Sequence, residues 1–290
     1  MLGLPNNKDL TIHGSPVLSQ FTICIKGAGE MASAVAWRLH RCGLRRILML
    51  EKPRPLAVRR RVCFCEAVYH GRQQVEGLTA RCVPDEHGID LVWGEGQIAL
   101  LVDPDWRILA KRHWDVVVDA ILAKRNLGTT LGEATLVIGL GPGFEAGKDV
   151  HRVIETLRGH HLGRVIEQGA AAANTGIPAA MGGVSRERVL RAPCAGLFQG
   201  LAAIGDQVRA GQTVARVDGR DVGASIDGLL RGLIKNETPV TAGLKIGDID
   251  PRGDAGYCST ISDKARAVAG GVLEAVLSKY NCLPVSRSAG

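Results

Sequence analysis

"IKGAGEMAS", residues 25–33, stands between an apolar run and a pattern typical of a helix. The run from Phe21 to Ile25 predicts a strand, and apolar residues then recur at helical spacing until Gly43. The turn matches G-x-G-x-x-A, in which Gly27 permits a tight turn and Gly29 lets the backbone approach a pyrophosphate. Ala32 permits close packing of the helix on the strand. The stretch therefore predicts a dinucleotide-binding turn, with a purely structural corner as the alternative.

A second strand, at residues 47–50, ends at Glu51, 22 positions after Gly29. A carboxylate at this place accepts hydrogen bonds from ribose hydroxyls and repels a 2′-phosphate, which favours NAD over NADP. Lys52 and Arg54 lie close by and weaken that preference.

Further apolar runs at residues 98–102, 116–118 and 136–138 lack alternation, as strands buried on both faces do. With the crossovers between them, these runs predict an α/β fold, a Rossmann-like doubly wound sheet. Ligands of such sheets bind outside the carboxyl ends of the strands. The cofactor-binding candidates at that edge are Gly27, Gly29, Glu30, Ala32, Glu51, Asp103, Asp119, Lys124, Arg125, Asn126, Gly141 and Gly143.

Two loops supply the later candidates. "AILAKRNLGTT", residues 120–130, brings Lys124, Arg125 and Asn126 within reach of a phosphate or oxyanion, unless it is only a charged surface loop. "GLGPGFEAGKDVH", residues 139–151, fails the P-loop pattern, and we expect Asp149 to cap a helix with an apolar stripe over residues 150–157.

Composition limits the function classes. Of the 290 residues 46% are hydrophobic and 4% aromatic, which favours packed α/β cores over a stacking platform for nucleic acid. The net charge of +7 includes the run Arg59–Arg61, which suits a phosphate-bearing ligand, an acidic partner or a solvated basic face. Eight cysteines without a CxxC pair indicate neither a metal site nor a disulfide framework. We expect a soluble, cytoplasmic protein with no membrane segment.

The last third contains a repeat. Residues 192–218 recur 32 positions later, matching Gly196 with Gly228 and Gly211 with Gly243. The spacing of short strands and turns resembles the biotinyl/lipoyl barrel-sandwich fold, whose carriers present a lysine on the hairpin between the halves. Arg220 stands in that hairpin here, so we expect no biotin or lipoate. Beyond the repeat, residues 258–280 predict an amphipathic helix, capped by Thr260 or Ser262, that docks on the first domain.

Four segments follow from these patterns. They are an N-terminal tail (1–20), a Rossmann-like nucleotide-binding domain (21–185), a barrel-sandwich module without a carrier lysine (186–252) and a C-terminal helix (253–290).

Several of these motifs together resemble one known family. They are GAGEMAS, VDAILAKRN, VIGLGPGFEAGKDVH, VIETLRGHHLGRVI, NTGIPA, LRGLI, GLKIGDIDPRG and ISDKARAVAGGVLEA. They look like the YqeB-type accessory proteins of the selenium-dependent molybdenum hydroxylase system, related to the maturation factors of xanthine and CO dehydrogenases. The resemblance covers about residues 21–280 and implies a role in preparing the molybdenum cofactor, with a molybdenum hydroxylase apoenzyme as partner. It transfers no catalytic residue.

Two function classes follow. The first is a binding and delivery factor that holds a molybdopterin dinucleotide or similar cofactor at the sheet edge. The second is an NAD-dependent oxidoreductase, which the absence of a Tyr-x-x-x-Lys pair at the strand ends makes the weaker alternative. Homo-oligomers are compatible with either class, and nucleic acid is a partner in neither.

Overall fold

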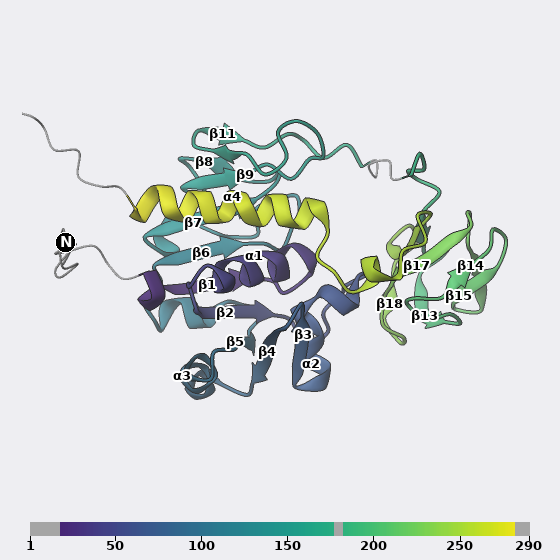
Figure 1. Cartoon of the computed structure of the whole chain (residues 1–290), viewed down its shortest axis with the longest axis horizontal. Coiled ribbons are helices and arrows are strands. Elements are labelled where there is room, and N and C mark those ends of the chain that lie inside the picture. Colours follow the sequence, from purple (N-terminus) through teal and green to yellow (C-terminus); the bar gives the residue numbers. More distant parts are fainter. Residues whose placement is uncertain (1–17, 177–181, 282–290) are drawn as a thin grey trace, which may run out of the picture.

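The computed structural model describes residues 18–176 and 182–281 as a mixed α/β protein with a large mixed sheet and three smaller antiparallel sheets, one of two strands and two of four (Figure 1). Most of the predicted N-terminal tail, part of the NTGIPA motif and the end of the predicted C-terminal segment lie outside the described residues. The described α-helices are α1 (Glu30–Arg41), α2 (Ala67–His70), α3 (Ile89–Gly94) and α4 (Asp263–Tyr280).

The large sheet has the order β10-β9-β7-β6-β1-β2-β5-β4-β3. Its seven inner strands are parallel, and β10 and β3 close the two edges in antiparallel fashion. The strands are β1 (Thr22–Lys26), β2 (Arg46–Glu51), β3 (Arg72–Val75), β4 (Leu78–Val83), β5 (Ile98–Val102), β6 (Val116–Asp119), β7 (Leu136–Leu140), β9 (Arg152–Ile154) and β10 (Val165–Ile166). The five strands predicted from apolar runs are therefore confirmed.

Alternate residues of these strands enter two different cores. Ile23 and Ile25 of β1 belong to the core with α1 and α4 on one face, whereas Cys24 belongs to the core with α3 on the other. Burial on both faces explains why the strands read as continuous apolar runs. The crossover from β6 to β7 contains the short 3-10 helix η6 (Leu131–Glu133) and no α-helix, and α4 from the far end of the chain covers that face beside α1 (Figure 1).

The helix predicted over residues 150–157 is wrong. Val150 forms an isolated bridge with Ala146 of the two-residue strand β8 (Glu145–Ala146), which pairs with β11 (Gly169–Ala170), and β9 follows as a strand. The Asp149 side chain accepts a hydrogen bond from Glu145 N and closes a turn rather than capping a helix. A short run of Val and Ile fits either period, and parallel pairing with β7 decides for the strand.

The two repeat copies interlock. Strands β13 (Gly196–Gly200), β14 (Gln207–Val208) and β15 (Thr213–Val217) recur as β17 (Gly228–Leu233), β18 (Pro239–Val240) and β19 (Lys245–Asp250). β14 of the first copy pairs with β17 of the second, and β18 of the second pairs with β13 of the first. The resulting sheets, β12-β19-β17-β14 and β16-β15-β13-β18, have equivalent orders, completed by β12 (Val189–Arg191) and β16 (Arg220–Gly223). Gly196 and Gly228 share the same unusual backbone, with φ of 151° and 154°.

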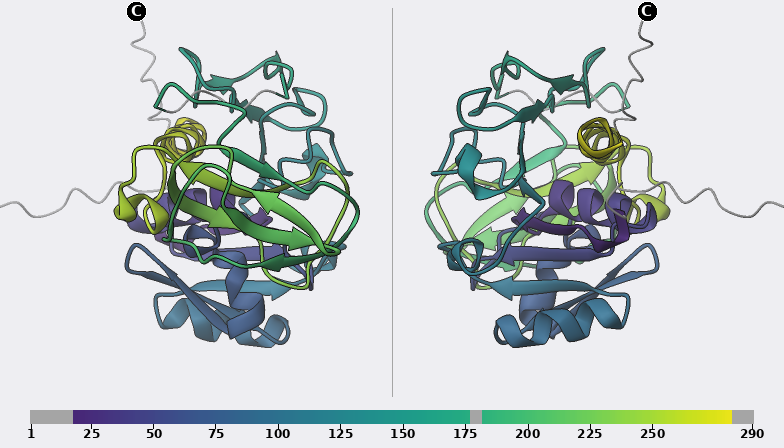
Figure 2. Two further views of the ribbon diagram at one scale, coloured as in Figure 1. Left: turned by 90° about the vertical axis from the view of Figure 1, so that its right-hand side faces the viewer. Right: turned by 90° about the vertical axis from the view of Figure 1, so that its left-hand side faces the viewer.

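Three consecutive arginines join these sheets to the rest of the chain. Arg59 donates to the carbonyl oxygens of Tyr257 and Thr260, Arg60 to that of Leu233, and Arg61 to that of Ile204. The guanidinium groups of this run therefore make hydrogen bonds within the protein, and Arg59 also lines the cleft described below. The C-terminal sheets lie against one end of the large sheet (Figures 1 and 2).

Helix α4 depends on a close backbone contact. A Cβ atom on Gly271 would overlap the carbonyl oxygen of Gly163, in the loop that crosses the helix, whereas one on Gly270 would meet nothing within 4 Å. We predict that Gly271→Ala lowers the free energy of unfolding by about 1–3 kcal/mol, as overpacking does. The matched control Gly270→Ala should raise it by up to about 1 kcal/mol, through helix propensity. Urea denaturation of both variants measures the difference, and equal midpoints would contradict the packing.

Candidate functional site

A cleft of about 1330 Å³ lies between the carboxyl edge of the large sheet and the C-terminal sheets. Residues at or just after the ends of β1, β2, β5, β6 and β7 line one side, and Arg188, Arg231 and Lys245 line the other. Its walls carry nine basic and four acidic side chains. The basic ones are Lys52, Arg59, Lys124, Arg158, Arg188, Arg191, Arg231, Lys245 and Lys264, and the acidic ones are Glu30, Glu51, Asp103 and Asp248. The excess of cations suits an anionic ligand.

The glycine turn forms part of this cleft. Gly27 has a φ of 93°, and its N–H donates to Leu50 O, which ties the turn to the neighbouring strand. Gly29 is the N-cap residue of α1, and no side chain accepts a hydrogen bond there. A Cβ on Gly29 would meet no atom within 4 Å, so the space beside the helix N-terminus is open. The first N–H groups of a helix and its dipole together favour an anion at such a place.

Glu51 supports the turn. Its carboxylate accepts hydrogen bonds from Ala28 N at 3.1 Å and Lys52 N at 2.9 Å. Burial raises the pKa of the Glu51 carboxyl, against the opposing effect of these two N–H groups and of the Lys52 ammonium. The side chain lines the cleft and also braces the loop.

Glu30 links the starts of two helices. Its Oε1 accepts hydrogen bonds from the Arg59 guanidinium and from the Ser262 hydroxyl, 2.8 Å away. Ser262 is the N-cap residue of α4 and accepts from Ala265 N. The N-termini of α1 and α4 are thereby held side by side at the cleft, and Glu30 acts as a link within the protein.

Three cations stand near the start of α4. Burial lowers the pKa of the Lys264 ammonium, and the positive charges of Arg158 and Lys124 lower it further, against the opposing effect of the Glu30 and Glu155 carboxylates. Arg158 makes two hydrogen bonds of 2.6 Å to Asp263. No hydrogen bond or ion pair within the described residues engages the ammonium groups of Lys124 and Lys264. The repulsion among these groups would be relieved by a bound anion.

A buried network lies behind the cleft wall. Lys26 Nζ donates to Thr129 Oγ1 at 2.7 Å and to Glu133 at 2.8 Å, and it lies 4.0 Å from the centre of the Trp106 ring. Thr129 in turn donates to Asp119 at 2.7 Å. Lys26 is fully buried and Asp119 nearly so. Asp119 is therefore part of the support of the site and not of its surface.

The predicted site residues divide into two groups. Gly27, Gly29, Glu30, Glu51, Asp103 and Lys124 come together at the cleft. Ala32 is a buried residue of α1, Asn126 hydrogen-bonds within its own loop, and Arg125 is exposed and outside the cleft lining. Gly141 and Gly143 serve packing, because a Cβ at either would overlap Thr156 or the backbone of Arg125.

Sequence reasoning missed several cleft residues, both neighbours of predicted residues and residues of distant segments. They are Trp106, Leu122, Arg158, Lys264 and the arginines of the C-terminal sheets, among others. Trp106, Leu122 and Lys124 all have positive φ, at 57°, 61° and 63°. Such backbone is strained in residues other than glycine and gathers at functional sites, but no sequence pattern in this chain announces it.

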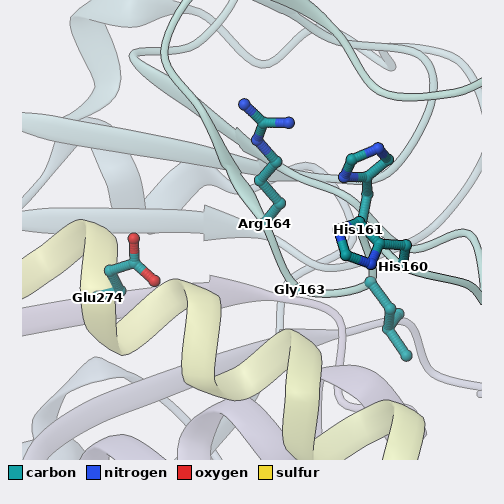
Figure 3. Close-up of a pocket in the computed structure, with 6 residues that line it drawn as sticks. His160, His161, Gly163, Arg164 and Glu274 are labelled. Carbon is teal, nitrogen blue, oxygen red and sulfur yellow. The ribbon is translucent and has the colours of Figure 1, made fainter.

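A second hollow, of about 460 Å³, lies over α4 (Figure 3). His160, His161 and Arg164 come from the crossing loop, and Glu274 from the helix. No group of three or more His, Cys, Asp or Glu side chains within residues 18–176 and 182–281 is arranged to hold a metal ion. None of the helices in those ranges is long and apolar enough to cross a membrane.

Comparison with known proteins gives one close sequence relative. The chain is 45% identical over 255 residues to a protein of Escherichia coli (strain K12) named "Uncharacterized protein YqeB". The aligned region is 88% of this chain and 47% of the relative, so the chain spans about half the length of the protein it matches. No protein-family profile matches the chain.

Solved structures are similar only at a distance. An aspartoacylase family protein from Mesorhizobium loti gives a TM-score of 0.26 at 10% identity, covering 79% of this chain and 84% of that one. The ectoine utilization protein EutE (DoeB) from Ruegeria pomeroyi gives 0.23 at 10% identity, covering 79% and 86%. A succinylglutamate desuccinylase/aspartoacylase from Rhodobacter sphaeroides gives 0.24 at 16% identity, covering 79% and 85%. Such low scores carry no functional argument.

The buried network yields a stability prediction. Lys26→Met leaves Glu133 without its ammonium partner in a largely buried place, so the free energy of unfolding should fall by about 3–5 kcal/mol. The exposed ion pair of Lys148 provides the control, and Lys148→Met should cost less than about 1 kcal/mol. Chemical denaturation measures both values, and a loss at Lys26 as small as that at Lys148 would refute the role of the network.

Proposed function

We propose that this protein is an accessory or maturation factor for a molybdenum hydroxylase, selenium-dependent in the system that the sequence resembles. In this role it binds a dinucleotide or molybdopterin-type cofactor in the cleft. The observation that best supports the proposal is the meeting of the Gly27–Gly29 turn, two helix N-termini and the ammonium groups of Lys124 and Lys264, which make no hydrogen bond or ion pair within residues 18–176 and 182–281. The sequence resemblance supplies the biological setting.

The strand order supports a Rossmann-like domain for the first part of the chain. β1 lies between β2 and β6, so the loops after β1 and β6 separate at this point of the sheet. Gly27 lies close to Ala120, the first residue after β6. A Cβ atom placed on Gly27 would be 3.4 Å from the carbonyl oxygen of Ala120. In open α/β sheets the crevice at such a switch point is where ligands bind.

The interlocked pairing of the repeats supports a barrel-sandwich module for the second part. Arg220 begins β16 in the hairpin after β15, where the carriers of that fold present lysine. An attached biotin or lipoate is not proposed. The module instead contributes Arg188, Arg231 and Lys245 to the cleft, so that a cofactor would be held between the two parts.

Binding to the cationic cluster is testable with small probes. We predict that Lys124→Ala and Lys264→Ala each weaken binding of pyrophosphate and NAD by about 10- to 150-fold, since charge-assisted hydrogen bonds are each worth about 1.5–3 kcal/mol. Arg125→Ala is the matched control, because Arg125 neighbours Lys124 but does not line the cleft, and its affinity should stay unchanged. Isothermal titration calorimetry gives the constants. Equal losses in all three variants would point to a diffuse charge effect and not to a site.

The role in maturation needs a cellular measurement. In a strain that carries only Lys124→Ala, we expect the molybdenum hydroxylase to accumulate as protein with low specific activity, while Arg125→Ala supports full activity. If Lys124→Ala loses cofactor binding but the hydroxylase is fully active with both variants, cofactor binding in the cleft is not needed for maturation. That result would refute the proposed role in maturation.

Proton linkage gives an independent test of Lys264. The pKa of Lys264 is lower in the folded protein than in the unfolded chain. At pH values between the folded-state pKa and the ordinary lysine pKa, the folded protein therefore binds fewer protons at Lys264 than the unfolded chain does. Stability therefore rises with pH across that window. A bound pyrophosphate should raise the pKa, so that binding takes up protons in the same window. Calorimetry in two buffers of different ionisation enthalpy measures the uptake, which Lys264→Met should abolish.

A further inference from the structure

Trp106 occupies an unusual place in the cleft wall. It follows β5 and precedes the 3-10 helix η5 (Arg107–Ala110), with left-handed backbone at φ 57° and ψ 32°. A left-handed conformation is unfavourable for so bulky a residue and is kept only when the surroundings enforce it. Among the described residues, three of the six non-glycine residues with positive φ line this one cleft. The strained backbone of Trp106, Leu122 and Lys124 therefore lies in the wall of the cleft.

One face of the Trp106 ring is already occupied. The Lys26 ammonium lies over it at 4.0 Å from the ring centre, and Lys26 has no exposed surface. Trp106 is half-buried, packs in part against the core that includes α3, and lines the cleft, so part of its side chain is exposed there. Aromatic rings stack in offset or edge-to-face arrangements, so the exposed part of the indole offers a surface for a flat ring of a ligand.

Asp103 stands three residues before Trp106 and also lines the cleft. Its Oδ2 accepts a hydrogen bond from Ile108 N at 2.9 Å, and its carbonyl oxygen accepts one from Trp106 N. No donor in the described part of the chain is bonded to Oδ1. The carboxylate is thus fixed in direction by η5 and keeps one oxygen for an amino group or ring N–H of a ligand.

The rest of the cleft divides by chemistry. Lys124 and Lys264, with the helix N-termini, form the cationic part described above. Apolar side chains of the loop after β6, Leu122 and Leu127, line the cleft as well, and this loop continues to Thr129, the partner of Lys26. An aromatic surface, a fixed acceptor and apolar side chains are the usual means of recognising a heterocyclic base.

We propose that Trp106 is the stacking surface for a fused amino-heterocycle, a purine or pterin, and that Asp103 accepts a hydrogen bond from it. The inference rests on the proposed binding of a phosphorylated cofactor and specifies which part of the cleft takes the ring. The ring system lies on Trp106, and the phosphate groups lie toward Lys124 and Lys264.

The test compares ligands with and without a base. ADP and inorganic pyrophosphate are titrated by calorimetry into the full-length protein and into Trp106→Leu and Trp106→Phe. Stacking on an aromatic side chain predicts a loss of about 5- to 150-fold in ADP affinity for Trp106→Leu, and a much smaller loss for Trp106→Phe. Pyrophosphate affinity should be unchanged in both. Trp37→Phe, at a tryptophan outside the cleft lining, is the control and should bind both ligands normally.

A fluorescence measurement covers the case in which Trp106→Leu does not fold. AMP should quench the intrinsic fluorescence of the unmodified protein and of Trp37→Phe, but not that of Trp106→Phe. Quenching that persists in Trp106→Phe would overturn the stacking role, as would an ADP affinity in folded Trp106→Leu within twofold of the original. If the unmodified protein binds neither pyrophosphate nor ADP, the proposed function itself fails, which is a distinguishable result.

Discussion

The buried ammonium group of Lys26 is the constraint on which the carboxyl edge of the sheet depends. Moving a lysine charge out of water costs several kcal/mol unless good partners surround it. Its partners here are Thr129, Glu133 and the Trp106 ring, which belong to the loops after β6 and β5. Because Lys26 is also the last residue of β1, satisfying its charge fixes three strand ends relative to one another. The glycine turn begins at the next residue, so its position follows from the same contacts.

A second set of contacts closes the cleft from the opposite side. Glu30 joins the start of α1 to Ser262 at the start of α4, and Arg59 joins Glu30 to carbonyl oxygens that precede α4. Arg60 and Arg61 then hold backbone carbonyls of the C-terminal sheets. These guanidinium groups bond to fixed oxygens and so orient the basic residues of the second repeat toward the glycine turn. The cleft is therefore a product of the whole chain, from residue 26 to residue 264.

The sequence predicted the features that depend on local chemistry. The apolar runs identified five strands because burial on both faces leaves no alternation, and Ser262 caps α4 as one of two expected residues. The repeat was readable because matched glycines such as Gly196 and Gly228 need the same rare backbone. The role of Asp119 could not be predicted from the sequence, because only the fold shows that its carboxylate accepts a hydrogen bond from Thr129 behind the cleft wall. Trp106 and Lys264 were missed since they meet the glycine turn through contacts far apart in sequence, and Val150–Ile154 was misassigned because a short apolar run fits both periods.

The two repeat copies differ in one respect that bears on function. Asp248 and Arg231 of the second copy correspond to Arg216 and Gln199 of the first, 32 positions earlier. Asp248 is fully buried, yet Lys245, Arg231 and Arg188 outweigh the effect of burial and keep the pKa of its carboxyl low. The first copy has at the matching place only an exposed Arg216–Asp221 pair. Both copies build the same strands, so the fold does not require the charged cluster, and buried ion pairs are seldom better for stability than apolar residues. The copy that carries the charged cluster is also the copy whose Arg231, Lys245 and Asp248 line the cleft, so the cluster contributes charge to the cleft wall that the first copy does not supply.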